Sequence, residues 1–257
     1  MTWVWLRGLA REAGHWGGLP RLAEQATGER VVCIDLPGTG AKFEQESPLR
    51  MSKLVAALKQ ETSDLGDIKL LAVSLGGLVG LHWAAADPRI HQLFLINSSS
   101  KLNFFFQRLR LAPAWQLLST LTSKRSVEER EREILAIVSN DPERARQVLS
   151  LWTEIARRRP VSARQVMRQL LLAATAGLPK PERLSHCQIQ ILASQADRLV
   201  ACKCSQRLSD YFNCSLVVHP RAGHDLPLDA PDWLLRKIAA PSIKDAKSRA
   251  GLLGSGN

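Results

Sequence analysis

Ile68-Lys69-Leu70-Leu71-Ala72-Val73-Ser74-Leu75-Gly76-Gly77-Leu78-Val79-Gly80 is the stretch that decides how this chain folds. An apolar run over 70–73 is short enough for a buried strand, and the chain breaks at Ser74 before small and apolar residues with helical potential. Small residues must flank a sharp strand-to-helix turn because its backbone is crowded, and Ala72 and Gly76 flank Ser74 at two positions on either side. Such a turn exposes the serine hydroxyl as a nucleophile and lets the N–H of Leu75 face a developing oxyanion. Taken alone, the pattern also fits an ordinary junction between a strand and a helix, so the rest of the chain must decide.

Composition and charge limit the classes to which the chain can belong. With 257 residues, 45% of them hydrophobic, it is long enough for one sizeable core and an inserted subdomain. The formal net charge of +11 suggests an acidic partner or surface. The N-terminus lacks the long apolar core of a signal peptide, and no apolar run approaches the length of a membrane-spanning helix. We therefore expect a cytoplasmic protein without membrane insertion.

The cysteines indicate neither a disulfide framework nor a zinc site. They number five, which is odd, and no Cys-x-x-Cys pair occurs among them. Free thiols in a reducing cytoplasm are the plain interpretation. We expect no metal and no cofactor.

Strands and helices alternate along the first part of the chain. The strands are predicted at 4–6, 31–34, 70–73 and 90–97, and the helices at 19–25, 51–61 and 78–86. The run Val31–Ile34 is continuously apolar, which predicts a strand buried on both faces. The alternation indicates βαβ units, and hence an α/β fold with a mostly parallel sheet flanked by helices.

The pattern changes between the fourth and fifth strands. No strand is predicted over 98–183, where helices are expected at about 104–111, 115–122, 127–138, 142–156 and 163–174. The alternation then resumes with strands at 189–193 and 215–219 and helices at 204–211 and 233–238. We therefore predict a core made of 1–97 and 184–240, a helical cap inserted at 98–183, and a disordered tail at 241–257, which has no apolar periodicity.

Three residues with complementary chemistry follow three of these strands. A serine hydroxyl is a weak nucleophile that needs a neighbouring base, and the base needs an acid to orient it. Ser74, Asp197 and His224 occur in the order nucleophile, acid, base, each on a loop after a predicted strand, where open α/β sheets place their sites. Asp225 and Asp229 are alternative acids, and His15 is the one other histidine on a loop near this site.

Over about residues 1–240 the chain resembles the α/β-hydrolase superfamily. The matching blocks are Asp35-Leu36-Pro37-Gly38-Thr39-Gly40, Ser74-Leu75-Gly76-Gly77, Asp197-Arg198-Leu199-Val200 and Gly223-His224 with Ala230-Pro231. In spacing and length it is most similar to the pimeloyl-acyl-carrier-protein methyl ester esterases of biotin synthesis and to neighbouring small carboxylesterases. The resemblance implies hydrolysis of a carboxylic ester by Ser74, His224 and Asp197 through an acyl-enzyme intermediate.

The resemblance also places an oxyanion hole at two backbone N–H groups, those of Leu9 and Leu75. The family usually has His-Gly before the first donor, whereas this chain has Arg7-Gly8. Because the donor is a backbone group, it is expected to survive the replacement, while the role of the usual histidine is left without a counterpart.

The inserted segment is strongly basic. From Lys101 to Arg183 there are sixteen Lys or Arg and eight Asp or Glu, so this segment carries +8 of the chain's +11. Arg157, Arg158 and Arg159 form the densest group and lack a local acidic balance. A basic surface beside an active site would steer an acidic carrier towards it, and relatives use cap arginines for an acyl carrier protein. Nucleic acid is disfavoured as a partner because no aromatic residues interleave with the charges.

One cap segment, Val148–Trp152, loosely resembles a substrate-lining helix of these relatives. On that resemblance Leu149 and Trp152 are candidate substrate-binding residues, and a buried helix face is the alternative. Two further functions stay open: an acyltransferase or thioesterase with the same triad, and a non-catalytic binding protein on a hydrolase scaffold.

Overall fold

A computed structural model describes residues 1–104, 108 and 125–240 of the chain. The predicted disordered tail at 241–257, the predicted helix at 115–122 and most of the one at 104–111 lie outside these residues. Within the described part, no helix is both long and apolar enough to cross a lipid bilayer.

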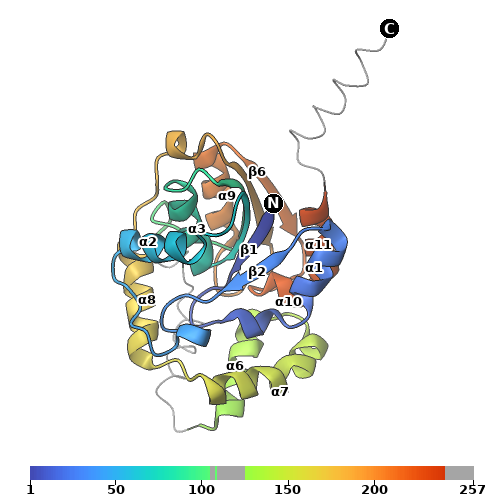
Figure 1. Ribbon diagram of the computed structural model, residues 1–257. Helices are drawn as coiled ribbons and strands as arrows, with labels where there is room; N and C mark the ends of the chain where they lie inside the picture. Colours follow the sequence, from blue (N-terminus) through green and yellow to red (C-terminus); the bar gives the residue numbers. More distant parts are fainter. Residues whose placement is uncertain (105–107, 109–124, 241–257) are drawn as a thin grey trace.

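A six-stranded parallel sheet forms the centre of the molecule (Figure 1). Its strands, in spatial order, are β2 (Val31–Ile34), β1 (Thr2–Leu6), β3 (Ile68–Val73), β4 (Ile90–Ile96), β5 (Gln188–Ser194) and β6 (Ser215–His219). Every neighbouring pair is parallel, so the carboxyl ends of all six strands lie on the same side of the sheet. This confirms the α/β fold expected from the alternating pattern.

Helices cover both faces of the sheet and one end of it. They are α1 (Leu19–Thr27), α2 (Met51–Glu61), α3 (Leu75–Ala84), α6 (Val127–Val138), α7 (Pro142–Arg158), α8 (Ala163–Thr175), α9 (Cys202–Phe212), α10 (Leu226–Asp229) and α11 (Pro231–Ala239). Short 3-10 turns lie at Ala13–Trp16, Gly40–Lys42 and Pro181–Leu184. In Figure 1, α1 and α11 lie side by side, whereas α6 and α7 lie together at one end of the sheet.

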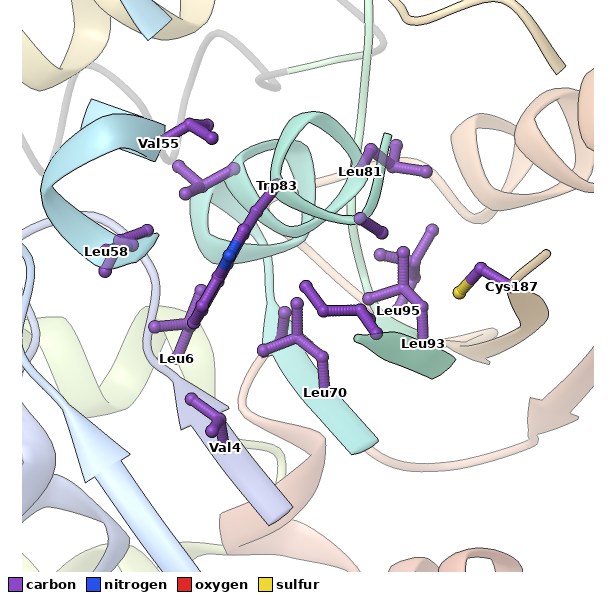
Figure 2. Close-up of a cluster of buried hydrophobic side chains, with 14 of the residues drawn as sticks. Val4, Leu6, Val55, Leu58, Leu70, Leu81, Trp83, Leu93, Leu95 and Cys187 are labelled. Atoms are coloured by element: carbon purple, nitrogen blue, oxygen red, sulfur yellow. The ribbon is translucent and has the colours of Figure 1, made fainter. Parts of the chain in front are cut away.

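Alternate residues of the strands pack into two separate hydrophobic layers, one on each face of the sheet. On β1, Val4 and Leu6 pack with α2 and α3, whereas Trp3 and Trp5 pack on the other face with α1 and α11. Figure 2 shows the first layer, where Trp83 of α3 lies over the strands. Because successive side chains of a strand point to opposite faces, a sheet covered on both sides needs apolar residues at nearly every position.

The expectation for Val31–Ile34 was wrong in one respect. Three of the four residues of β2 are only partly buried, because β2 is an edge strand of the sheet. A continuous apolar run therefore identified a strand, but not its place in the sheet.

Helix α3 begins at Leu75, three residues earlier than the apolar pattern predicts. Gly76 and Gly77 are weak helix formers, which explains the later predicted start. The structure uses them for close packing, since a Cβ on Gly77 would lie 1.9 Å from Ser98 Oγ. The helix can thus begin directly at the carboxyl end of β3.

Three described helices of the inserted segment, α6, α7 and α8, lie between β4 and β5 in the sequence. A small apolar cluster joins α6 and α7 to the start of α9, with Leu135, Trp152 and Cys204 at its centre. The division into a core of 1–97 and 184–240 and a cap of 98–183 stays a prediction.

Candidate active site

Ser74 occupies the turn between β3 and α3 in a strained backbone conformation. Its φ of 55° and ψ of −117° lie in a region that side chains rarely adopt. The backbone N–H of Ser74 donates to the carbonyl of Ile96 at 2.8 Å, which ties the turn to the end of β4. No described residue hydrogen-bonds to Ser74 Oγ, so the hydroxyl is available at the cavity that this residue lines.

The turn fits tightly against the end of β1. A Cβ on Gly76 would lie 2.5 Å from the carbonyl oxygen of Arg7, and a Cβ on Gly8 would lie 3.0 Å from Ser74 Cβ. The missing Cβ atoms therefore allow the two backbones to approach each other. This approach brings Leu9 and Leu75 to the same cavity, and among the described residues no acceptor takes a hydrogen bond from either backbone N–H.

His224 and Asp197 form a buried hydrogen-bonded pair. Nδ1 of His224 lies 2.7 Å from Oδ2 of Asp197, and the two residues are 7% and 2% exposed. The other carboxylate oxygen of Asp197 accepts from the N–H groups of Leu199 and Val200, at 2.8 and 2.9 Å. When Nδ1 carries the hydrogen of the neutral imidazole and donates a hydrogen bond to Asp197, the lone pair of the ring lies on Nε2.

The electrostatic surroundings of His224 favour its protonated form. Burial is the largest influence and opposes the charge, but Asp197, with a smaller contribution from Asp225, outweighs it and raises the pKa of His224 above its ordinary value. A positive charge on this imidazole is thus more favourable than on a free histidine side chain.

The two other candidate acids do not contact this imidazole. Asp225 forms a bidentate ion pair with Arg7, in which Nη1 donates to Oδ1 at 3.1 Å and Nη2 donates to Oδ2. Asp229 accepts from the N–H groups of Gly223 and Asn140, at 2.6 and 2.8 Å, and from Ser139 Oγ at 2.5 Å. Of the three carboxylates, only that of Asp197 hydrogen-bonds to the ring of His224.

A single cavity of about 270 Å³ collects most of these groups. Ser74, His224, Leu9 and Leu75 all line it, although no hydrogen bond joins Ser74 to His224 in the described part of the chain. In ligand-free structures such bonds are often long and tighten on binding. The rest of the wall is mainly apolar and includes Val127, Ile134, Val138, Ile155, Val161, Val166, Leu170, Ala173, Leu199 and Val200.

Neither of the two cap residues singled out by resemblance lines the cavity. Trp152 is 1% exposed, with the guanidinium of Arg11 4.5 Å from its ring and His15 edge-on at 5.0 Å. Leu149 packs into the apolar cluster between α6 and α7. The buried helix face is therefore the better interpretation of this segment, and Ile155 on the same helix lines the cavity instead.

His15 is a buried wall residue of the cavity. Arg11 Nη1 lies 2.9 Å from its Nε2, and the N–H of Glu12 lies 3.1 Å from its Nδ1. Burial, together with the charges of Arg11 and Arg7, holds the pKa of His15 well below its ordinary value. A neutral ring at this place is consistent with a packing role.

The arginine group at the end of α7 is less unbalanced than the sequence suggested. Arg158 pairs with Glu154 at 2.5 Å, and Arg159 pairs across 147 positions of the chain with Glu12 at 3.0 Å. Among the described residues, Arg157 has no such ionic partner. The expectation that the group lacks a local acidic balance was therefore wrong for Arg158, because Glu154 lies one turn earlier on the same helix, whereas the partner of Arg159 comes from a distant loop.

Sequence reasoning missed two asparagines that hold the loops of the site. Asn97, after β4, has a φ of 46°, and its amide donates to the carbonyl of His224 at 2.9 Å and to Ser194 Oγ at 3.0 Å. Asn140, between α6 and α7, donates to the carbonyls of Ala196 and Arg221 at 3.0 and 3.1 Å. An asparagine directly after an apolar strand is the available signal for the first, because asparagine tolerates a positive φ.

Asn97→Ala is expected to lower both stability and turnover. It removes buried hydrogen bonds to the histidine loop and to the end of β5, which costs about 1–3 kcal/mol of the free energy of unfolding. Asn213→Ala is a matched control, because Asn213 also has a positive φ of 47° but is exposed at the end of α9. Denaturant unfolding and kcat of both variants check this; equal losses in the two would mean that only the backbone conformation matters.

Comparisons with known proteins agree with this architecture. The Alpha/beta hydrolase family matches over residues 3–237. Over 99 residues the chain is 34% identical to a pimeloyl-[acyl-carrier protein] methyl ester esterase of Stenotrophomonas maltophilia (strain K279a), a match covering 38% of this chain and 36% of that protein. The matched part thus spans about a third of the esterase.

Solved structures share the fold at lower sequence identity. A meta-cleavage product hydrolase from Pseudomonas fluorescens IP01 has a TM-score of 0.74 at 17% identity, over 93% of this chain and 89% of that one. A 2-hydroxy-6-oxo-6-phenylhexa-2,4-dienoate hydrolase from Rhodococcus sp. strain RHA1 has a TM-score of 0.69 at 21% identity, over 92% and 88%. With a family match that covers nearly the whole described chain, the protein belongs to the α/β hydrolase family.

Proposed function

We propose that this protein is a serine carboxylic-ester hydrolase. The observation that carries the proposal is the buried 2.7 Å contact between His224 and Asp197 at a cavity that also contains the strained Ser74. A nucleophile at a sharp turn, a base and an orienting carboxylate are the parts that acyl transfer by serine requires.

In the proposed mechanism, Ser74 Oγ attacks the ester carbonyl while Nε2 of His224 accepts the hydroxyl proton. Asp197 keeps Nδ1 protonated and stabilises the imidazolium that forms. The N–H groups of Leu9 and Leu75 donate to the oxyanion of the tetrahedral intermediate. His224 then gives its proton to the leaving alcohol, which leaves an acyl-enzyme, and water releases the acid by the same steps.

The proposed substrate is an acyl ester of modest size, in its most specific form a methyl ester on a pimeloyl-type chain carried by an acidic acyl carrier protein. The mainly apolar wall of the cavity suits an acyl chain. The similarity over 99 residues to a protein named as an esterase for such a substrate supports the choice. An acyltransferase or a thioesterase would use the same residues with another acceptor or leaving group.

The decisive experiment separates reaction classes by their products. Methyl esters and thioesters of matched chain length, free and carrier-linked, are supplied with and without an acceptor alcohol. We expect the free acid from the methyl esters, with no transfer product. In parallel, intact-mass analysis after treatment with an organophosphonate probe is expected to show one adduct, located at Ser74. If the acyl group goes mainly to the added alcohol, the proposed hydrolysis is replaced by acyl transfer; no adduct at all would favour a binding protein.

The carrier part of the proposal predicts a salt-dependent rate. Arg157 and Arg158 are exposed, and charges at the rim of a site act mainly on association and are screened by salt. We expect a carrier-linked ester to have a higher kcat/KM than the matching free ester, with an advantage that shrinks as salt rises. Reversing both arginines to glutamate is expected to remove the advantage and leave hydrolysis of the free ester unchanged.

The control for this experiment reverses two charges elsewhere. Arg21 and Arg30 are exposed on and just after α1, so their change to glutamate alters the net charge equally. This control is expected to keep most of the carrier advantage. A docking surface at the end of α7 would be contradicted by either of two results. One is that carrier linkage gives no advantage at low salt, and the other is that the control variant loses the advantage as fully as the variant reversed on α7.

A further inference from the structure

Arg7 and Asp225 form an ion pair that is buried beside the cavity. Arg7 directly follows β1, and Asp225 directly follows His224, so the pair joins residues 218 positions apart. In the sheet, β3, β4 and β5 lie between β1 and β6. The pair therefore spans the strand that carries Ser74 and connects the proposed oxyanion loop to the histidine loop.

The pair is buried and has contacts on both sides. The Arg7 and Asp225 side chains are 5% and 6% exposed, and the guanidinium lies 4.6 Å from the ring centre of Trp16. The backbone N–H of Asp225 donates to the carbonyl of Val138 at 2.8 Å, which fixes the histidine loop to the end of α6. On the other side, the carbonyl of Arg7 lies against Gly76, directly beside the turn of Ser74. These contacts thus connect the position of the histidine loop to that of the loop after β1.

A buried ion pair of this kind is not explained by stability alone. Taking two charges out of water is costly, and apolar residues of similar size are often at least as stabilising. The bidentate geometry and the stacking on an aromatic ring are also specific to arginine, because lysine has a single charged nitrogen and no planar group. These features point to a role in the site beside which the pair lies.

We propose that Arg7 and Asp225 are positioning residues that hold His224 over Ser74 and balance the charge around its imidazole. The inference rests on the proposed function, since it gives His224 the role of the base. The charged groups that act on His224 are Asp197, Asp225 and Arg7, and Asp225 is in turn influenced by Arg7, His224 and Arg11.

The charge part of the proposal predicts opposite shifts in two single variants. Asp225→Asn removes a negative charge and leaves the Arg7 charge unopposed, so the pKa of His224 falls. Because His224 must be neutral to accept a proton, the acid limb of the profile of kcat/KM against pH then moves to lower pH, by roughly one unit. Arg7→Gln leaves the Asp225 charge unopposed and moves this limb to higher pH. In the double variant, Arg7→Gln with Asp225→Asn, the limb returns close to that of the wild type.

The positional part is tested by Arg7→Lys. This variant keeps the positive charge but loses the fork and the stacking, so the pH limb stays near the wild-type position. A small displacement of a catalytic group lowers turnover strongly, and we expect kcat to fall by roughly 10-fold or more with little change in KM. A simple loss of stability would instead leave the kcat of the folded fraction unchanged.

A pair remote from the site provides the control. Arg89 pairs with the buried Asp87 at 2.7 Å, just before the amino end of β4. Arg89→Gln is expected to lower Tm without moving the pH limb or kcat. All variants are compared by kcat/KM against pH on a free methyl ester, with the active fraction measured by labelling of Ser74.

The outcomes separate this inference from the proposed function. If Ser74→Ala keeps its activity, the proposed function is wrong, and the pair then has no catalytic base to position. If Ser74→Ala is inactive but Asp225→Asn keeps the wild-type pH limb and kcat, the positioning role alone is overturned. Should Arg7→Gln not fold, Asp225→Asn and the double variant still decide the matter, because the first must shift the limb and the second must restore it.

Discussion

Ser74→Ala is expected to lower kcat for ester hydrolysis by roughly 10⁶-fold, the loss known for serine nucleophiles in comparable triads. The hydroxyl is the only group that the proposed mechanism joins covalently to the acyl chain, and alanine has nothing to replace it. The fold is expected to persist, because the side chain makes no hydrogen bond to any described residue, and alanine adopts the positive φ no less easily than serine. Initial rates on a methyl ester, together with Tm, measure both effects.

Ser98→Ala is the matched control for this change. Ser98 is buried near the turn, with its Oγ 3.2 Å from the carbonyl of Ile96, but it lies outside the proposed triad. Its variant is expected to keep most of the activity. Residual activity above a tenth of wild type in Ser74→Ala would show that another group is the nucleophile.

Asp197→Asn is expected to lower kcat by about 10⁴-fold. The N–H groups of Leu199 and Val200 would hold the amide oxygen of the new side chain, so its NH₂ group would face Nδ1 of His224. A neutral imidazole that accepts a hydrogen bond at Nδ1 carries its own hydrogen on Nε2, and this nitrogen is then unable to take the proton of Ser74. The geometry stays intact while the tautomer becomes wrong.

Asp229→Asn separates this effect from a general loss of loop structure. Asp229 accepts from Gly223, Asn140 and Ser139 but does not touch the imidazole. We expect a lower Tm and a much smaller loss of kcat than in Asp197→Asn. A reversal of the two losses, measured at saturating substrate, would move the role of the acid away from Asp197.

Local rules explain why much of the fold was predictable. The elbow around Ser74 needs small neighbours, and βαβ units need apolar strands that alternate with helices; both requirements appear in neighbouring residues of the sequence. The described helices of the inserted segment were also predictable, because Ser126, Asp141 and Ser162 cap their N-termini. The order of Ser74, Asp197 and His224 similarly needs no tertiary knowledge.

Long-range contacts explain what was not predictable. The pair of Arg7 with Asp225, and that of Arg159 with Glu12, join positions 218 and 147 apart, which no local pattern indicates. The cavity wall is likewise a product of how α6, α7 and α8 sit over the sheet, so periodicity on α7 could not distinguish Trp152, which packs inward, from Ile155, which lines the cavity. The edge position of β2 also depends on strand order rather than on composition.

The short corner between α6 and α7 has a consequence for anyone who recombines this protein with its relatives. The carbonyl of Val138 accepts a hydrogen bond from the N–H of Asp225, and the carbonyl of Ser139 accepts one from the guanidinium of Arg198. The side-chain amide of Asn140 donates to the carbonyls of Ala196 and Arg221. Helices α6 and α7 are therefore not an interchangeable module, since the corner between them also holds the loops that contain Asp197 and His224. A chimaera that takes these helices from another hydrolase therefore has to retain residues 138–140 of this protein. Otherwise it has to take both loops from the other hydrolase together with the helices.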